Sequence, residues 1–266
     1  MTEFNFKNKT VLITAGSKGI GFALAQEFAI NGANVAICSR NISNLRKAKN
    51  MINKKNNDNK ILTLKYDLND SKNIKRLFSR TEKYFNSKID ILINNSGGPP
   101  PKLISETTNK DWERALNVNF KSSIFTSMIA IKEMKKKKWG RIINLTSSTA
   151  KEPVKKMCLS NVTRAGLASF GKTLSLEVAE YGITVNTILT GGVLTERLKN
   201  LVKIRIKNTN LNFNKEIDKI AKNIPVGRIA EPIEFIQLIL FLASEKSSYI
   251  TGTAIPIDGG SSKNIF

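Results

Sequence analysis

The stretch Thr10-Val-Leu-Ile-Thr-Ala-Gly-Ser-Lys-Gly-Ile-Gly21 joins an unbroken apolar run to a glycine-rich turn near the start of the chain. An apolar run without alternation is typical of a strand buried on both faces of a parallel sheet. The helical pattern over 20–31 then places the glycines at a helix N-terminus, where free backbone amides bind phosphate groups. We therefore expect a strand, a dinucleotide-binding turn and a helix, in that order.

The same alternation of apolar runs and helical patterns continues to the C-terminus. Strand-like runs cover 10–14, 34–38, 61–66, 89–94, 140–144, 184–189 and 254–257. Helical patterns cover 20–31, 42–53, 71–84, 110–136, 161–181 and 232–244, with a charged, Asn-rich helical insertion over 194–223. Strands that alternate with helices indicate βαβ units. We predict an α/β fold, a Rossmann-type doubly wound sheet of seven parallel strands flanked by helices, as a single dinucleotide-binding domain over 1–266.

Composition excludes several function classes. The chain contains no histidine, which rules out Ser-His-Asp and Cys-His hydrolases and histidine ligands to zinc or haem iron. Cys38 and Cys158 are too few for a disulfide framework or a structural zinc site, so we expect no metal and a reducing cytoplasm. The N-terminus lacks a signal-peptide pattern, and the longest apolar stretch, 235–243, is too short to span a bilayer.

The charge balance is strongly basic. There are 43 Lys+Arg against 21 Asp+Glu among 266 residues, a formal net charge of +22. Such an excess can mark a nucleic-acid or anionic-surface partner. Lys, Asn and Ile are all abundant and share A/T-rich codons, and the basic residues are spread along the chain apart from the run 135–138. We favour base-composition bias, and expect neither a nucleic-acid nor a membrane partner.

The glycine turn and several later motifs resemble the short-chain dehydrogenase/reductase family over residues 8–260. The family pattern T-G-x-x-x-G-x-G matches here with Ala15 in place of its first glycine. Further matches are the acidic pair at 67–68, N-N-S-G at 94–97, V-N at 118–119, and a segment over 191–195 that follows Thr190 where the family has proline. The resemblance implies these cofactor-binding residues: Ala15, Gly16, Ser17, Lys18, Gly19, Ile20, Gly21, Asp67, Leu68, Asn95, Ser96, Gly97, Gly191, Val193 and Thr195.

Cofactor preference rests on Arg40, which follows the second strand-like run. NAD-selective folds place a carboxylate there for the ribose hydroxyls, whereas an arginine suits a 2′-phosphate. Lys18 adds a second positive charge in the glycine turn. We expect NADP(H) to be preferred, with NAD(H) left open; the alternative is that Arg40 merely begins a solvated helix.

The catalytic pattern departs from the family. The resemblance implies Asn119 as the catalytic asparagine, which kinks a helix and holds a water, and Ser147 as the catalytic serine. The family has Tyr thirteen residues after that serine and Lys four later, whereas this chain has Ser160 and Arg164. Arg164 stays protonated and cannot act as a base, but it can bind ribose hydroxyls, polarise a carbonyl or hold a carboxylate. The stretches 95–101, 151–153 and 159–164 resemble a β-ketoacyl-acyl-carrier-protein-reductase-like subgroup that lacks the standard tetrad.

Three functions remain open at this point. The first is an NAD(P)-dependent oxidoreductase acting on a carbonyl/alcohol pair, with 3-oxoacyl compounds as the nearest class. There Ser147 and Ser160 bond the substrate oxygen, and water or a lysine at 151, 155 or 156 supplies the proton. The second is a non-redox enzyme on the same scaffold, and the third is an inactive NADP-binding regulatory protein. The expected ligands are a small-molecule carbonyl or alcohol substrate, with an acyl carrier as a further candidate. The resemblance also implies a homotetramer, assembled through the helices over 110–136 and 161–181.

Overall fold

A seven-stranded parallel sheet forms the centre of the computed structural model, which describes residues 4–55, 61–207 and 212–265. Its strand order is β3-β2-β1-β4-β5-β6-β7. The strands are β1 Thr10–Ile13, β2 Asn34–Ser39, β3 Ile61–Lys65, β4 Ile91–Asn94, β5 Gly140–Leu145, β6 Ile183–Thr190 and β7 Ala254–Ile257. After β3 the chain crosses to the other side of β1, so the order reverses between β1 and β4. Ligands of open α/β sheets bind at such a switch point, outside the carboxyl ends of the strands.

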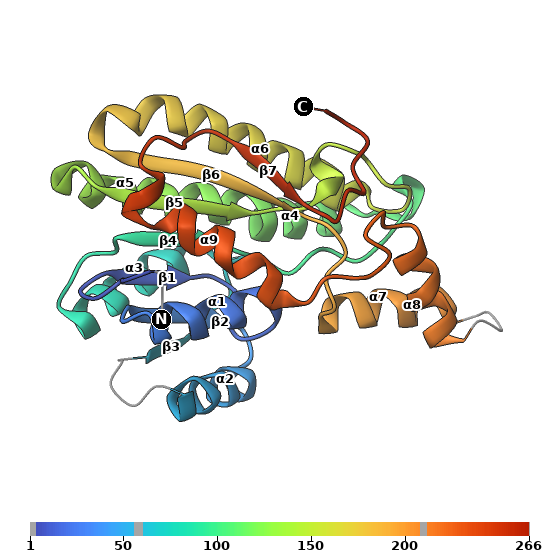
Figure 1. Cartoon of the computed structure of the whole chain (residues 1–266), viewed down its shortest axis with the longest axis horizontal. Helices are drawn as coiled ribbons and strands as arrows, with labels where there is room; N and C mark the ends of the chain where they lie inside the picture. Colours follow the sequence, from blue (N-terminus) through green and yellow to red (C-terminus); the bar gives the residue numbers. More distant parts are fainter. Residues whose placement is uncertain (1–3, 56–60, 208–211, 266) are drawn as a thin grey trace.

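Helices cover both faces of this sheet, which confirms the predicted Rossmann-type architecture (Figure 1). One face packs against α1 (Gly19–Ile30), α2 (Ile42–Lys55) and α9 (Ile236–Ala243). The other packs against α3 (Ser71–Phe85), α5 (Ser122–Lys137) and α6 (Cys158–Val178). Helices α7 (Glu196–Ile206) and α8 (Phe213–Lys222) lie beyond the sheet, at the right of Figure 1.

The apolar runs at the centre of the sheet, such as β1, β4 and β5, fold as strands because both of their faces are buried. Along β1, Val11 and Ile13 belong to the core cluster beneath α1, whereas Leu12 belongs to the cluster beneath α3 and α5. Successive side chains of a strand point to opposite faces, so an uninterrupted apolar run supplies both cores at once. Because the glycine turn directly follows β1, it lies at the carboxyl edge of the sheet.

Two helices differ from the sequence prediction near the site. The pattern over 110–136 folds as α4 (Asn109–Leu116), a π-helical turn (Asn117–Lys121) and α5. The pattern over 161–181 begins earlier, because α6 starts at Cys158, which places Ser160 in its first turn. The insertion over 194–223 contains α7 and α8, and its residues 208–211 lie outside the described ranges.

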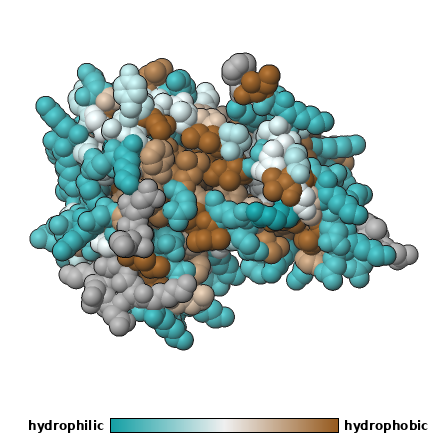
Figure 2. Space-filling view, in the orientation of Figure 1, coloured by the Kyte–Doolittle hydropathy of each residue, from teal (hydrophilic) through white to brown (hydrophobic). Residues whose placement is uncertain are grey.

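No helix in the described part of the chain combines the length and the apolar character needed to cross a bilayer. Figure 2 shows one face of the molecule, where hydrophobic residues gather over α9 and β7 within a margin of hydrophilic ones.

Candidate active site

A cavity of about 1070 Å³ opens at the carboxyl edge of the sheet. It runs from the glycine turn and the end of β2, past the ends of β4 and β5, to α6 and the start of α7. All the predicted site residues line it except Gly16 and Gly21. The lining predicted residues are Ala15, Ser17, Lys18, Gly19, Ile20, Arg40, Asp67, Leu68, Asn95, Ser96, Gly97, Asn119, Ser147, Ser160, Arg164, Gly191, Val193 and Thr195.

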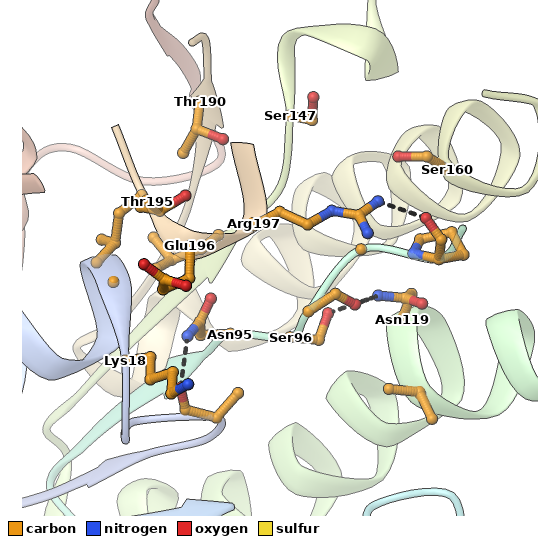
Figure 3. Close-up of a pocket in the computed structure, with 18 of the residues that line it drawn as sticks. Lys18, Asn95, Ser96, Asn119, Ser147, Ser160, Thr190, Thr195, Glu196 and Arg197 are labelled. Carbon is orange, nitrogen blue, oxygen red and sulfur yellow. Dashed lines mark hydrogen bonds between the residues drawn. The ribbon is translucent and has the colours of Figure 1, made fainter. Parts of the chain in front are cut away.

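Gly16 and Gly21 lie beneath the glycine turn and keep it close to the sheet. A Cβ on Gly16 would lie 2.7 Å from Cγ2 of Ile37, and one on Gly21 would lie 2.6 Å from Nδ2 of Asn95. Asn95 Nδ2 also donates a 3.2 Å hydrogen bond to the Ala15 carbonyl (Figure 3). The two glycines therefore act as spacers that let the turn's backbone amides approach a ligand.

Ala15 adopts a left-handed backbone conformation, with a φ of +47°. Glycine takes such angles freely, whereas an L-residue with a Cβ is strained there. The turn forms in spite of this departure, because the Gly16 amide donates to the Cys38 carbonyl at 3.1 Å.

Arg40 and Lys18 are exposed and border the same end of the cavity. Asp67, also at this end, forms a 3.6 Å ion pair with Arg114. Two positive side chains beside amides at a helix start are suited to the phosphates of a dinucleotide. The cradle kept clear by Gly16 and Gly21, together with these cations, fits NADP(H).

Asn119 lies in the π-helical turn between α4 and α5 and is buried. Its Nδ2 donates to Ser96 Oγ at 2.8 Å and to the Gly97 carbonyl at 2.7 Å. No donor within the described ranges reaches its Oδ1, although the residue lines the cavity. π-turns inside helices are frequent at functional sites, and this one turns the asparagine toward the cavity with one acceptor atom free.

Ser147 and Ser160 bring hydroxyl groups to the cavity from two elements (Figure 3). Ser147 follows β5, and its Oγ accepts from the Thr149 amide at 3.3 Å, which leaves its O–H free to donate outward. Ser160 comes from the first turn of α6 and is only 5% exposed. Thr190, between them and α7, donates through Oγ1 to the Thr146 carbonyl at 2.9 Å.

Arg164 lies one turn further along α6 and is 5% exposed. Its guanidinium donates to the Leu145 carbonyl at 2.9 Å and to the Ser96 carbonyl at 3.1 Å. Burial lowers the pKa of Arg164 to about 10, with a further contribution from the positive charge of Arg197. It therefore remains protonated at neutral pH, as a buried cation held by neutral carbonyls.

Arg197 is a site residue that the sequence analysis missed. It extends from the start of α7 across the cavity, and its Nη2 donates to the Pro99 carbonyl (Figure 3). Burial lowers the pKa of Arg197 as well. A basic residue in the first turn of a helix opposes the helix dipole. This unfavourable position was the only signal in the sequence that Arg197 has a role outside its own helix.

The three lysines considered as proton donors do not reach the site. Lys155 and Lys156 are exposed, Lys151 is half-buried, and none of them lines the cavity. The loop that carries them is turned away where Lys102 donates its amide to the Lys156 carbonyl at 2.7 Å. Within the described ranges no cluster of three or more Cys, Asp or Glu side chains is placed to hold a metal ion.

Comparisons with known proteins agree with this fold. The family model described as enoyl-(acyl carrier protein) reductase matches residues 14–262. The chain is 32% identical to the NADPH-dependent reductase BacG of Bacillus subtilis, over 97% of this chain and 99% of that protein. It is 34% identical to the 3-oxoacyl-[acyl-carrier-protein] reductase FabG of Buchnera aphidicola, over 96% and 97%.

Solved structures of related proteins have the same fold. The L-sorbose reductase from Gluconobacter frateurii, complexed with NADPH and L-sorbose, superimposes with a TM-score of 0.93. It is 28% identical, and the match covers 99% of this chain and 100% of the other. The chain therefore belongs to the short-chain dehydrogenase/reductase family of oxidoreductases.

Proposed function

We propose that this protein is an NADPH-dependent reductase of a carbonyl/alcohol pair, with 3-oxoacyl compounds as the nearest substrate class. In this proposal residues 1–266 form one NADP-binding domain. The observation that carries it is one cavity that joins a phosphate-suited glycine turn to a cluster of hydroxyl and guanidinium groups. The names of the relatives, which include an NADPH-dependent reductase and a 3-oxoacyl-[acyl-carrier-protein] reductase, support the same assignment.

The residues of the glycine-turn end would hold the cofactor. Backbone amides over 15–21 take the pyrophosphate, and Arg40 with Lys18 takes the 2′-phosphate. Asp67 and Leu68 border the adenine, and 95–97 with 191–195 border the nicotinamide half. When bound, NADPH supplies a hydride to the carbonyl carbon of the substrate.

Ser160 and Arg164 take the positions of the usual tyrosine and lysine. A serine hydroxyl is a much weaker acid than a phenol, so we assign Ser160 and Ser147 to hydrogen bonding with the carbonyl oxygen. Arg164 then stabilises the negative charge that develops on this oxygen, because it stays protonated in a buried setting.

The proton would come from water held at Asn119. Asn119 lines the cavity, and its Oδ1 accepts no bond from the described residues, so this oxygen can accept one from a water molecule. Since the lysines of the 151–156 loop lie outside the cavity, a water is the remaining donor that fits the geometry.

Titration of the purified protein with NADPH and NADH tests the cofactor premise, and NADPH oxidation over a panel of carbonyl compounds tests turnover. We expect tighter NADPH binding than NADH binding and oxidation with some carbonyls. Failure to bind either nucleotide contradicts the proposal. Binding without oxidation over a broad panel favours the inactive regulatory protein instead.

We further propose a homotetramer assembled through α5 and α6. These helices expose large hydrophobic side chains at Phe125 (39%), Met128 (51%), Val162 (53%) and Leu176 (72%). Exposed apolar residues on neighbouring helices are typical of protein interfaces. Light scattering should give four times the monomer mass, and Leu176→Glu should lower it; a monomeric wild type contradicts this assembly.

A further inference from the structure

Two guanidinium groups face the same cavity without an acidic partner. Arg164 and Arg197 both line it, and neither makes an ion pair within the part of the chain that the structure describes. The Nε of Arg164 is buried and has no hydrogen-bond partner among the described residues. Removing a cation from water is costly unless an opposite charge compensates it.

The position of Arg197 is fixed by contacts with neighbouring residues of α7 and of the loop after β4. Thr195 caps α7 by accepting from the Leu198 amide, which fixes the start of the helix. The guanidinium then lies against Gly98, where a Cβ would be 3.0 Å from Nη2. Since Gly98 leaves room for the guanidinium and Pro99 supplies its carbonyl partner, the loop after β4 accommodates this one side chain.

The carboxylates that line the cavity are engaged or placed elsewhere. Asp111 is paired with Lys102 at 2.7 Å, and Asp67 is paired with Arg114. Glu196 is exposed, and in Figure 3 its carboxylate lies on the glycine-turn side of the cavity. None of them therefore neutralises the two arginines from within the protein.

The location of Arg197 also separates it from the phosphates of a dinucleotide. Its neighbour Thr195 lies against the glycine turn, since a Cβ on Gly19 would be 3.2 Å from Thr195 Cγ2. The Arg197 guanidinium extends in the opposite direction and lies between the level of Ser160 and that of Asn119 (Figure 3). This is the end of the cavity where the substrate is expected.

We propose that the substrate carries a carboxylate close to its reacting carbonyl, and that Arg197 binds this carboxylate. The carboxylate takes the place of the Pro99 carbonyl on the guanidinium, while the charge of Arg164 nearby favours an anion over a neutral ligand. Arginine suits the role because its planar fork binds a carboxylate through two parallel hydrogen bonds. This inference rests on the proposed function: it keeps the reduction of a carbonyl group and selects free oxo acids over neutral 3-oxoacyl thioesters as the substrates.

The test compares an anion with its neutral counterpart. Isothermal titration of the NADP⁺-loaded protein with benzoylformate and with methyl benzoylformate varies the charge while keeping the same ketone. We expect the acid to bind at least about tenfold more tightly than the ester, because hydrogen bonds to charged groups are the stronger ones. Arg197→Leu should weaken acid binding by roughly 10- to 100-fold. Arg197→Lys keeps the charge but loses the forked guanidinium, so its dissociation constant for benzoylformate should lie between those of wild type and Arg197→Leu.

Lys203→Leu is the matched control. Lys203 is an exposed cation on the same helix, α7, and does not line the cavity. Its replacement should leave both dissociation constants within twofold. The inference is overturned if wild type binds the acid and the ester equally, if it binds neither, or if Arg197→Leu weakens both alike.

Failure of the proposed function gives a different result. If the protein does not bind NADP⁺, the cofactor assignment is wrong. The same titration of the cofactor-free protein then tests whether Arg197 binds a carboxylate. The protein could instead bind NADP⁺ and benzoylformate with the expected dependence on Arg197, yet oxidise no NADPH with any carbonyl. That result contradicts the reductase assignment and supports the carboxylate site.

Discussion

The two ends of the cavity are built on different principles. The glycine-turn end consists of backbone, small residues and the exposed cations Arg40 and Lys18. The opposite end, formed by α6, the π-turn and the start of α7, consists of partly or fully buried polar side chains that bond to carbonyl groups.

We propose that the chain departs from its family at Ser160 and Arg164, and the difference between the two ends of the cavity accounts for the location of this change. At the glycine-turn end, cofactor binding depends on the path of the backbone, so a substitution there must preserve this path. At the opposite end, function depends on side-chain chemistry, which can change while the helices and strands stay in place. On this proposal Ser160 and Arg164 change the chemistry without altering the scaffold, because both lie in the regular helix α6.

Gly21→Ala should have the largest effect, because it disturbs the backbone end directly. The new Cβ would lie 2.9 Å from the Ala15 carbonyl and 3.1 Å from the Gly16 Cα, which are backbone atoms that cannot move independently. We expect the NADPH dissociation constant, measured by fluorescence titration, to rise at least about 100-fold, as loss of several charge-assisted bonds to the phosphates implies. Gly166→Ala on α6 is the control, since its Cβ meets the Phe120 ring at 3.3 Å outside the cavity. An affinity unchanged by Gly21→Ala would remove the glycine turn from the cofactor site.

Arg164→Lys tests the side-chain end and should come next in magnitude. A lysine keeps the positive charge but cannot bridge the Leu145 and Ser96 carbonyls as the guanidinium does at 2.9 and 3.1 Å. We expect kcat to fall by roughly 10- to 100-fold for any carbonyl that wild type reduces, the range that one or two charged hydrogen bonds provide. Steady-state kinetics measures it, and an unchanged or higher kcat would mean that charge alone is needed at this position.

Arg40→Asp returns to the glycine-turn end and should change preference more than overall affinity. The carboxylate would repel a 2′-phosphate and accept from ribose hydroxyls. The ratio of the NADH and NADPH dissociation constants should shift by about tenfold or more toward NADH, which corresponds to about 1.4 kcal/mol. Lys47→Asp on α2, a cation away from the cavity, is the control for net charge. A ratio that stays constant would refute the assignment of Arg40 to the phosphate.

The same contrast explains how much could be predicted from the sequence. The strands at the centre of the sheet, such as β1, β4 and β5, follow from apolar runs buried on both faces, and the turn follows from glycines after the first strand. Arg197 could not be predicted, because its function depends on reaching a carbonyl 98 residues away in the chain. The early start of α6 was missed because periodicity defines helices poorly at their ends. The resemblance implied a kink at Asn119, and the structure has a π-helical turn there. The lysines at 151, 155 and 156 were near the site in sequence only, since the loop turns them outward.

Ala15→Gly should give the smallest effect, and it tests the one departure at the glycine-turn end. Ala15 has a φ of +47°, and an L-residue in this region is destabilised by roughly 1–2 kcal/mol. Glycine removes that strain but loses about 0.4–1 kcal/mol through the greater freedom of the unfolded chain. The net gain in the free energy of unfolding should be about 0.5–1 kcal/mol by chemical denaturation, with NADPH affinity within threefold of wild type.

Asn86→Gly is the matched control for this last effect. Asn86 ends α3 with a φ of +50°, and asparagine tolerates left-handed angles better than alanine. Its gain should therefore be smaller than that of Ala15→Gly. A gain at Ala15 without a change in affinity would show that the alanine is tolerated strain, because the turn keeps its path. A loss of stability or of affinity would show instead that the Ala15 methyl group contributes to the site, and the backbone end would then depend on a side chain as the opposite end does.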